Sequence, residues 1–169
     1  DYVWEDQDVQ SLIASIAKGF PVGALLTLET GGQVAFKPRT LAGVETINAN
    51  PEELLLDGQQ RMTSLFQAMY CKRPIRTRTQ KNVEVERFYY LNIEKAATDA
   101  ANIEDAIVGV PADRVTRINF GRDVQLDIST PESEFEHDLF PLNQVFDHTD
   151  WYFNWRGHWK NRKPDRFEL

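Results

Sequence analysis

The sequence predicts a single sheet domain of mixed helices and strands, of the α+β or α/β class, and two observations indicate this. Segments with helical periodicity alternate with strand-like segments in the first half of the chain, whereas short strand-like segments cluster in the second half. The length of 169 residues is that of one ordinary domain with a substantial core. We therefore expect one domain over residues 1–149, followed by an aromatic and basic helical extension over residues 150–169 that belongs to the same domain or begins a linker.

The first half is predicted to contain a helix, strands and a strand-turn-helix segment. Val9, Leu12, Ile13 and Ile16 recur at helical spacing, which predicts an amphipathic helix ending at Lys18-Gly19. Residues 24–29 are almost continuously apolar, which favours a central strand. A short strand is predicted over residues 34–37 and a loop over residues 38–51. The apolar residues 54–56 predict a buried strand that stops at Asp57-Gly58, and a helix is predicted to begin near Gln59 or Gln60.

The second half is predicted to be mainly strands. Residues 74–81 are expected to form an exposed, mobile excursion, followed by a strand over residues 87–93 that places Phe88 and Tyr90 on one face and Tyr89 and Leu91 on the other. A helix is predicted over residues 94–101, and strands over 106–110, 115–120 and 121–129. Thr130 and Pro131 have the chemistry of an N-cap and a first helical residue, so a helix should begin there and stop before Pro141.

Tryptophans recur every four residues near the C-terminus, at Trp151, Trp155 and Trp159, and would form one stripe of a helix. Basic residues of the same segment form the neighbouring stripe. We interpret the tryptophans as side chains that dock this helix onto the domain or onto a following part of the protein. The alternative is that they stack on a nucleic-acid strand.

Charge and motif content exclude several function classes. The net charge of −7 argues against general coating of nucleic acid, although Lys72, Arg73, Arg76 and Arg78 lie close together and are candidate DNA contacts. No apolar stretch is long enough to span a membrane. The single cysteine, Cys71, excludes an internal disulfide and a cysteine-built metal site, which favours a cytoplasmic protein. Neither a P-loop nor a dinucleotide-binding glycine motif occurs, and the oligomeric state stays open.

The strand-turn-helix segment at Asp57-Gly58-Gln59-Gln60-Arg61 is the best candidate for a functional site. The free N–H groups and the dipole at a helix start favour an anion, most often a phosphate. Gly58 permits close approach to the backbone, Arg61 can grip phosphate oxygens, and Asp57 can bind Mg²⁺ or orient a water molecule. The structural alternative is that Asp57 caps the helix and Gly58 only makes the turn.

The segment Asp57–Arg61 resembles the signature of the GmrSD-type restriction endonuclease N-terminal domain family. Two further segments fit in the same order, Asp1-Tyr2-Val3-Trp4 and Gly19-Phe20-Pro21-Val22-Gly23, and Phe140-Pro141-Leu142-Asn143 is a weaker match. Asp1 opens the chain with neither an initiator methionine nor a signal-peptide pattern, so we expect the chain to be part of a longer protein, and the Gln-Arg of the family's opening motif is therefore missing here. The resemblance implies a ParB/sulfiredoxin-like fold with a small mixed sheet flanked by helices, and hydrolysis of nucleoside triphosphates beside a C-terminal HNH-type nuclease domain that acts on modified foreign DNA.

The resemblance also implies a role for each motif residue. Asp57 would orient the attacking water or hold Mg²⁺, Gln60 would position water or a phosphate oxygen, and Arg61 would stabilise charge on the transferred phosphoryl group. The remaining candidates would surround the phosphates (Gly58, Gln59, Thr63, Ser64), and Tyr2 and Trp4 would lie beside the nucleotide or brace the loop. No His-Asn-His motif occurs, so DNA cleavage is expected only from another domain. The competing hypothesis is a non-catalytic module that retains the fold and senses DNA or a partner.

Overall fold

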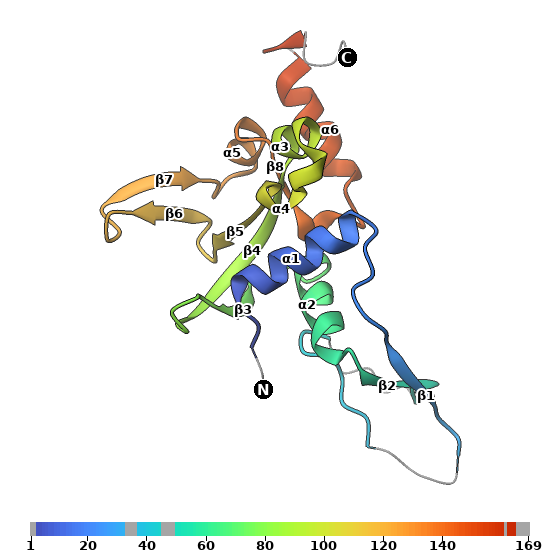
Figure 1. Cartoon of the computed structure of the whole chain (residues 1–169). Helices are drawn as coiled ribbons and strands as arrows, with labels where there is room; N and C mark the ends of the chain where they lie inside the picture. The colour runs from blue at the N-terminus through green and yellow to red at the C-terminus, as the bar shows by residue number, and fades with distance from the viewer. Residues whose placement is uncertain (1–2, 33–36, 45–49, 161, 165–169) are drawn as a thin grey trace.

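The computed structural model describes residues 3–32, 37–44, 50–160 and 162–164. Its main sheet is built on the nine-residue strand β4 (Glu84–Asn92) (Figure 1). One edge of β4 pairs with β5 (Ile107–Pro111), and the other pairs with β3 (Ile75–Arg78) and β8 (Leu139–Pro141), all antiparallel. A parallel bridge from Glu5 to Arg78 attaches the N-terminal segment to β3, so the sheet is mixed. The predicted α+β class is confirmed.

Successive side chains of β4 enter two separate hydrophobic cores, because strand residues alternate between the faces of a sheet. Tyr89 lies in a core with residues of α1 (Asp6–Ala17) and α2 (Gln59–Met69), and Tyr90 lies in a second core on the opposite face. The predicted alternation is confirmed. Burial raises the pKa of both tyrosine hydroxyls, which therefore stay hydrogen-bond donors: Tyr89 donates to Asp6 at 2.7 Å and Tyr90 to Glu134 at 3.1 Å.

Helix α1 lies across the sheet (Figure 1), and the burial of its apolar residues shows that the predicted apolar stripe faces inward. Val9, Leu12 and Ile13 are buried, and each such side chain contributes about 1.5–3 kcal/mol when fully buried. The fourth predicted position, Ile16, is 38% exposed because it lies in the last turn of the helix. Asp6 fixes the start of α1 on the sheet through Tyr89 and through Arg87, whose Nε lies 3.5 Å from the carboxylate.

Strands β1 (Leu26–Glu29) and β2 (Glu53–Asp57) form a separate antiparallel ribbon that projects from the body, at the lower right of Figure 1. The prediction of a central strand over residues 24–29 was wrong, since within the described chain β1 pairs only with β2 and Leu26 is 57% exposed. The strand at residues 54–56 is confirmed, but Leu56 is 44% exposed, so the strand is not buried. An apolar run shows that a strand forms but not which elements cover it. Most of the predicted strand 34–37 lies outside the described residues.

Strands β6 (Val115–Ile118) and β7 (Asp123–Asp127) form a hairpin that projects on the other side of the body (Figure 1). The first strand ends earlier than predicted because Asn119, Phe120 and Gly121 all have positive φ and form the turn. Residues 74–81, predicted as a mobile excursion, include strand β3, which pairs with β4 along its whole length. That prediction was wrong because Ile75 and Thr77 of β3 are buried, although Arg76 between them is exposed to solvent.

Short helical elements connect the strands. They are α3 (Ile93–Thr98), η1 (Ala100–Asn102), α4 (Ile103–Ala106), α5 (Pro131–Glu136) and η2 (Leu142–Gln144). Thr130 caps α5 as predicted, since its hydroxyl accepts from the Ser133 amide at 3.2 Å. The helical segment predicted over residues 94–101 is divided between α3 and η1.

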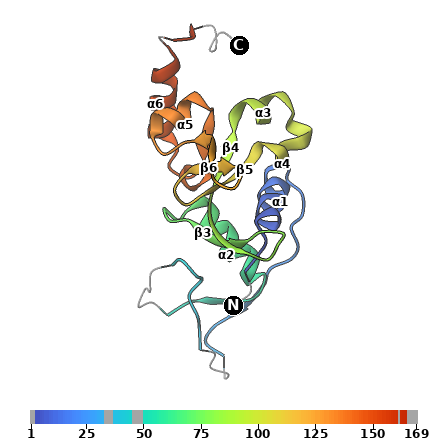
Figure 2. The same cartoon turned by 90° about the vertical axis from the view of Figure 1, so that its left-hand side faces the viewer.

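The C-terminal helix α6 (Thr149–Lys160) packs on α5 at the end of the molecule opposite the β1–β2 ribbon (Figure 2). Trp151 and Trp159 are buried, and their indole N–H groups donate to Glu134 and to the Phe135 carbonyl, both at 3.1 Å. The docking interpretation of the tryptophan stripe is therefore confirmed for these side chains. In the described part of the chain, no helix has the length and apolar character needed to cross a bilayer.

Candidate functional site

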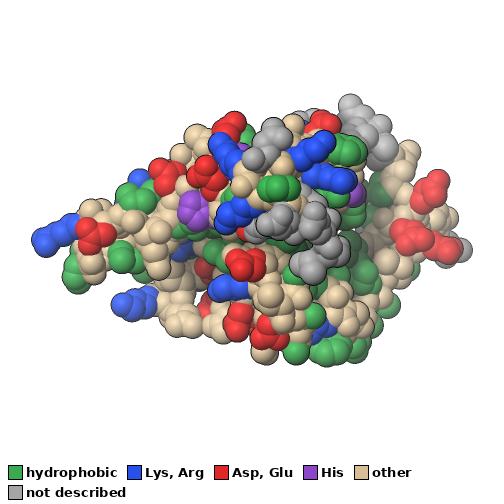
Figure 3. Space-filling view, turned by 90° about the horizontal axis from the view of Figure 1, so that it is seen from above, with side chains coloured by type: hydrophobic (Ala, Val, Ile, Leu, Met, Phe, Trp, Pro, Cys, Tyr) green, Lys and Arg blue, Asp and Glu red, His purple; other side chains and the backbone are tan. Residues whose placement is uncertain are grey.

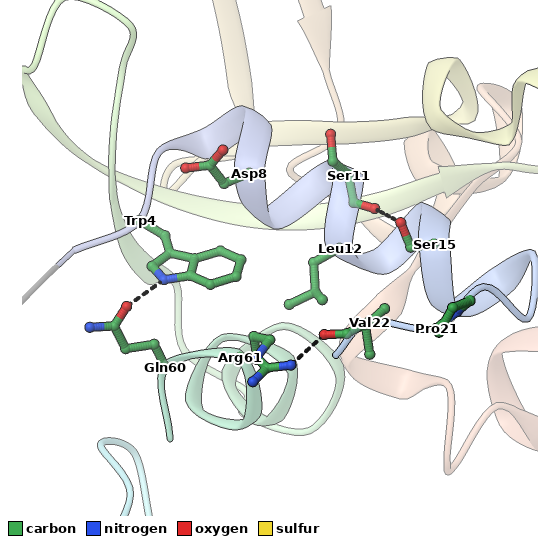
Figure 4. Close-up of a pocket in the computed structure, with 9 residues that line it drawn as sticks. All are labelled: Trp4, Asp8, Ser11, Leu12, Ser15, Pro21, Val22, Gln60 and Arg61. Carbon is green, nitrogen blue, oxygen red and sulfur yellow. Dashed lines mark hydrogen bonds between the residues drawn. The ribbon is translucent and has the colours of Figure 1, made fainter. Parts of the chain in front are cut away.

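A cavity of about 520 Å³ opens between α1, the start of α2 and the segment that follows α1 (Figure 4). Its size falls in the range of about 300–1,000 Å³ that is usual for small-ligand sites. The lining residues come from residues 4–22 and from the distant start of α2: Trp4, Asp8, Ser11, Leu12, Ser15, Pro21, Val22, Gln60 and Arg61. Each of the three motifs of the sequence analysis supplies at least one of them. The cavity is therefore where these motifs meet.

Gly58 starts α2 in the left-handed conformation, with φ +85°. Two reasons require a glycine here. Residues with a Cβ rarely adopt this φ, and a Cβ at this position would overlap the Leu25 side chain. Gly58 provides no side-chain cap, and the first N–H groups of a helix have no intrahelical partner. The turn thus presents backbone donors and the positive end of the helix dipole, as expected for an anion site.

The Arg61 guanidinium forms one wall of the cavity, and some of its N–H groups are hydrogen-bonded to backbone carbonyls beside it. Its Nη1 donates to the Val22 carbonyl, and its Nη2 donates to the Ala24 carbonyl at 2.9 Å. The Nη2 atom also lies 3.7 Å from the Asp57 carboxylate. The side chain keeps 21% of its surface exposed, and a guanidinium has further N–H groups that these contacts do not use. Arg61 therefore both attaches the segment after α1 to α2 and retains donors for a ligand.

Trp4 and Gln60 form the adjacent wall. The Trp4 carbonyl accepts from the Arg78 amide at 3.0 Å, which attaches this segment to β3. The Trp4 indole N–H donates to Oε1 of Gln60 at 2.9 Å. Because an indole N–H can only donate, this contact fixes the amide orientation and leaves the NH₂ group of Gln60 as a donor for another partner. Trp4 thus holds the Gln60 amide in place, and its expected role of lying beside the nucleotide or bracing the loop stays a prediction.

Asp57 lies beside the cavity rather than in its lining. Its carboxylate is 75% exposed, and within the described chain its partner is Arg61. The two residues are not locked together in the interior, and their phosphate roles stay predictions. Tyr2, the other aromatic candidate, lies outside the described residues.

The remaining phosphate-site candidates are occupied by local contacts. Gln59 donates to the Leu55 carbonyl at 2.8 Å, and Thr63 donates to the Gln59 carbonyl at 2.7 Å. Ser64 faces the interior with 8% of its surface exposed. The structure brings none of these three side chains into the cavity lining, and their phosphate roles stay predictions.

The basic candidates for DNA contact lie away from the cavity. Arg76 and Arg78 face glutamates directly across the β3–β4 ladder, with nitrogen to oxygen distances of 3.8 Å to Glu86 and 3.3 Å to Glu84. Lys72 and Arg73 are exposed before β3. On the face seen from above in Figure 3, basic and acidic side chains are interspersed among the described residues. DNA binding by these four residues stays a prediction.

Sequence reasoning missed the wall that α1 contributes, which consists of Asp8, Ser11 and Ser15 beside Leu12. These polar residues recur at spacings of three and four, so a polar stripe was readable on the predicted helix. Ser11 donates to Glu104 and Ser15 donates to the Ser11 carbonyl at 2.8 Å, so both hydroxyls are engaged. Asp8 is exposed and is therefore the ionisable group of this wall that can meet a ligand.

A Mg²⁺ ion fits this site only if a single protein carboxylate holds it together with water and substrate phosphates. Among the described residues, no three His, Cys, Asp or Glu side chains cluster as ligands of a metal. Mg²⁺, however, is commonly held by one or two carboxylates together with water and substrate phosphates. The exposed Asp57 carboxylate can supply such a single ligand.

Comparisons with known proteins match most of the chain. A family model described as "GmrSD restriction endonuclease, N-terminal domain" matches residues 1–151. The uncharacterized protein MJ0686 of Methanocaldococcus jannaschii is 28% identical over 173 residues, a match that covers 98% of this chain but only 28% of that relative. No solved structure matches the chain. The ParB/sulfiredoxin-like label therefore stays a prediction.

Proposed function

The chain belongs to the GmrSD restriction endonuclease N-terminal domain family, and we propose from this that it binds and hydrolyses nucleoside triphosphates as the regulatory domain of a DNA restriction enzyme. The observation that carries the proposal is the convergence of Trp4, Val22, Gln60 and Arg61 on one cavity at the start of α2. These residues belong to three separate motifs, and a purely structural turn would not require all three to line an open cavity.

The phosphates would bind at the N-terminus of α2, where unpaired backbone N–H groups, the helix dipole and the Arg61 guanidinium all favour negative charge. The NH₂ group of Gln60, oriented by Trp4, would donate to a phosphate oxygen or hold the attacking water. Arg61 would stabilise the charge that develops on the transferred phosphoryl group. Its contacts to Val22 and Ala24 preorganise it for this task, because they remove freedom that binding would otherwise have to restrict.

Asp57 would act as the general base that orients water or as the protein ligand of Mg²⁺. A bound Mg²⁺ ion would neutralise part of the phosphate charge. DNA cleavage would come from a C-terminal HNH-type nuclease domain acting on modified foreign DNA, with nucleotide hydrolysis here controlling it.

Phosphate release from nucleoside triphosphates tests the proposal. Asp57→Asn is the informative variant, because the exposed carboxylate can be replaced with little effect on folding, about 0.5 kcal/mol or less. We expect its turnover to fall by about 10²-fold or more, the usual contribution of a general base. Glu53→Gln, at the exposed opposite end of the same strand, is the matched control and should retain full activity.

Arg61→Ala should also abolish turnover, but this substitution additionally releases Val22 and Ala24. Hydrogen exchange in β1 would separate the two effects, since only the structural loss deprotects the ribbon. Unchanged turnover in both Asp57→Asn and Arg61→Ala would overturn the enzymatic assignment. Binding of triphosphate without hydrolysis in the unaltered chain would favour the non-catalytic sensing module instead.

A further inference from the structure

The α1 wall of the cavity carries an acidic group that the phosphate chemistry does not use. Figure 4 shows Asp8 on α1 and Arg61 on α2 on opposite sides of the cavity. In this view Asp8 lies above the Trp4 ring and Arg61 lies below it. Within the described chain Asp8 has neither an ion-pair nor a hydrogen-bond partner. The cavity is therefore electrostatically polarised, with a cationic wall and an anionic wall.

This polarity orients a nucleotide. A carboxylate without an ion-pair partner, such as Asp8, repels phosphate oxygens, whereas the Asp57 carboxylate is paired with Arg61. We therefore expect the triphosphate at the Arg61 wall, with the uncharged end of the ligand facing Asp8. An ionised carboxylate only accepts hydrogen bonds, and the ligand must therefore present donors there. The Trp4 ring and Leu12 provide an apolar surface between the two walls, which suits a sugar or base but not a phosphate.

Among the parts of a nucleotide, the ribose meets these conditions for every base. Its 2′ and 3′ hydroxyls are neighbouring donors whose spacing matches the two oxygens of a carboxylate, whereas the donor pattern of the base edge differs from one base to another. Carboxylates recognise ribose hydroxyls in this way in other nucleotide-binding folds.

We propose that Asp8 accepts hydrogen bonds from the ribose hydroxyls of the bound nucleoside triphosphate and makes the site selective for ribonucleotides over 2′-deoxyribonucleotides. This inference rests on the proposed function, because it assumes that the phosphates occupy the Arg61 wall. It goes beyond that function by defining the substrate class and assigning a specificity role to a residue outside the three motifs.

Calorimetric titration with two ribonucleotide and deoxyribonucleotide pairs, ATP with dATP and UTP with dUTP, tests the inference. A hydrogen bond to a charged acceptor predicts that the unaltered chain binds each ribonucleotide about tenfold more tightly than its deoxy analogue. In Asp8→Ala the preference should fall below about twofold in both pairs, because ribonucleotide binding weakens. Asp105→Asn, which removes an exposed charge from α4 outside the cavity lining, is the matched control and should leave the preference unchanged.

Inorganic triphosphate separates this inference from the proposed function. It should bind Asp8→Ala at least as tightly as the unaltered chain, since a repelling charge is removed. If the unaltered chain binds inorganic triphosphate but does not distinguish the sugars, or distinguishes them for one base only, the ribose assignment is overturned and the phosphate site stands. If it binds neither inorganic triphosphate nor any nucleotide, the proposed function itself fails, and the ribose assignment with it.

Discussion

Gly23 lies directly against the guanidinium of Arg61, so that a Cβ built on Gly23 would be 3.0 Å from Cζ of Arg61 and closer still to Nη1. The two residues belong to different motifs, one after α1 and one in the first turn of α2. Their contact explains why a glycine with φ +94° stands at this position. It also means that the position of Arg61 depends on backbone geometry far away in the sequence.

Substitution of Gly23 by Ala should therefore destabilise the protein and displace Arg61. The positive φ costs about 1–2 kcal/mol for a residue with a Cβ, and the steric overlap with the guanidinium adds to that cost. Urea denaturation would measure the loss in free energy of unfolding. Gly31→Ala is the matched control, because Gly31 has φ +101° but no atom within 4 Å of its virtual Cβ. Equal losses in the two variants would show that contact with Arg61 is unimportant.

The hydrogen bond from Trp4 to Gln60 should be measurable as a coupling between the two residues. Trp4→Phe removes the donor and keeps an aromatic ring, and Gln60→Leu removes the acceptor at similar size. In a double-mutant cycle on the free energy of unfolding, we expect a coupling of about 1 kcal/mol. Trp4→Phe should also weaken nucleotide binding, because the Gln60 amide is then free to rotate. Strictly additive effects would show that the indole does not orient Gln60.

The parts of the fold that depend on local chemistry could be predicted from the sequence. The start of α2 follows from Gly58, and the start of α5 follows from Thr130 and Pro131, because turn and cap preferences involve only a few neighbouring residues. The alternation of Tyr89 and Tyr90 was readable because strand geometry alone determines it.

The parts that depend on tertiary contacts could not be predicted in this way. The apolar residues 24–29 form a strand in a projecting ribbon, and no local signal shows that the main sheet is built on β4 instead. Of the residues that line the cavity, the sequence analysis named Trp4, Gln60 and Arg61 as site candidates, and their roles toward a nucleotide stay predictions. Asp8 was missed because its position opposite Arg61 depends on how α1 packs, which is set by distant contacts such as that between Asp6 and Tyr89.

The buried Glu134 should make the free energy of unfolding fall as the pH rises, which is the opposite of the effect of a carboxylate whose pKa is lowered in the folded state. Its side chain accepts from Tyr90 and Trp151, both at 3.1 Å, and lies 3.4 Å from the Arg114 guanidinium. Burial raises the pKa of the Glu134 carboxyl above its ordinary value of 4.5, although the hydrogen bonds and Arg114 act to lower it. The folded state therefore retains this proton at pH values where the unfolded state has released it.

From this shift the direction of the pH dependence follows. Well below pH 4.5 the Glu134 carboxyl is protonated in both states and contributes no pH dependence. As the pH rises above that value the folded state binds more protons, so the free energy of unfolding falls until the pH passes the raised pKa. Glu134→Gln does not titrate at this position. We therefore expect the unaltered chain to lose stability relative to this variant between pH 4.5 and the raised pKa. Urea denaturation at a series of pH values would measure this difference in the free energy of unfolding. Glu132→Gln, an exposed substitution on the same helix, should not change the profile of the unaltered chain. Parallel profiles for the unaltered chain and Glu134→Gln would mean that burial does not raise this pKa.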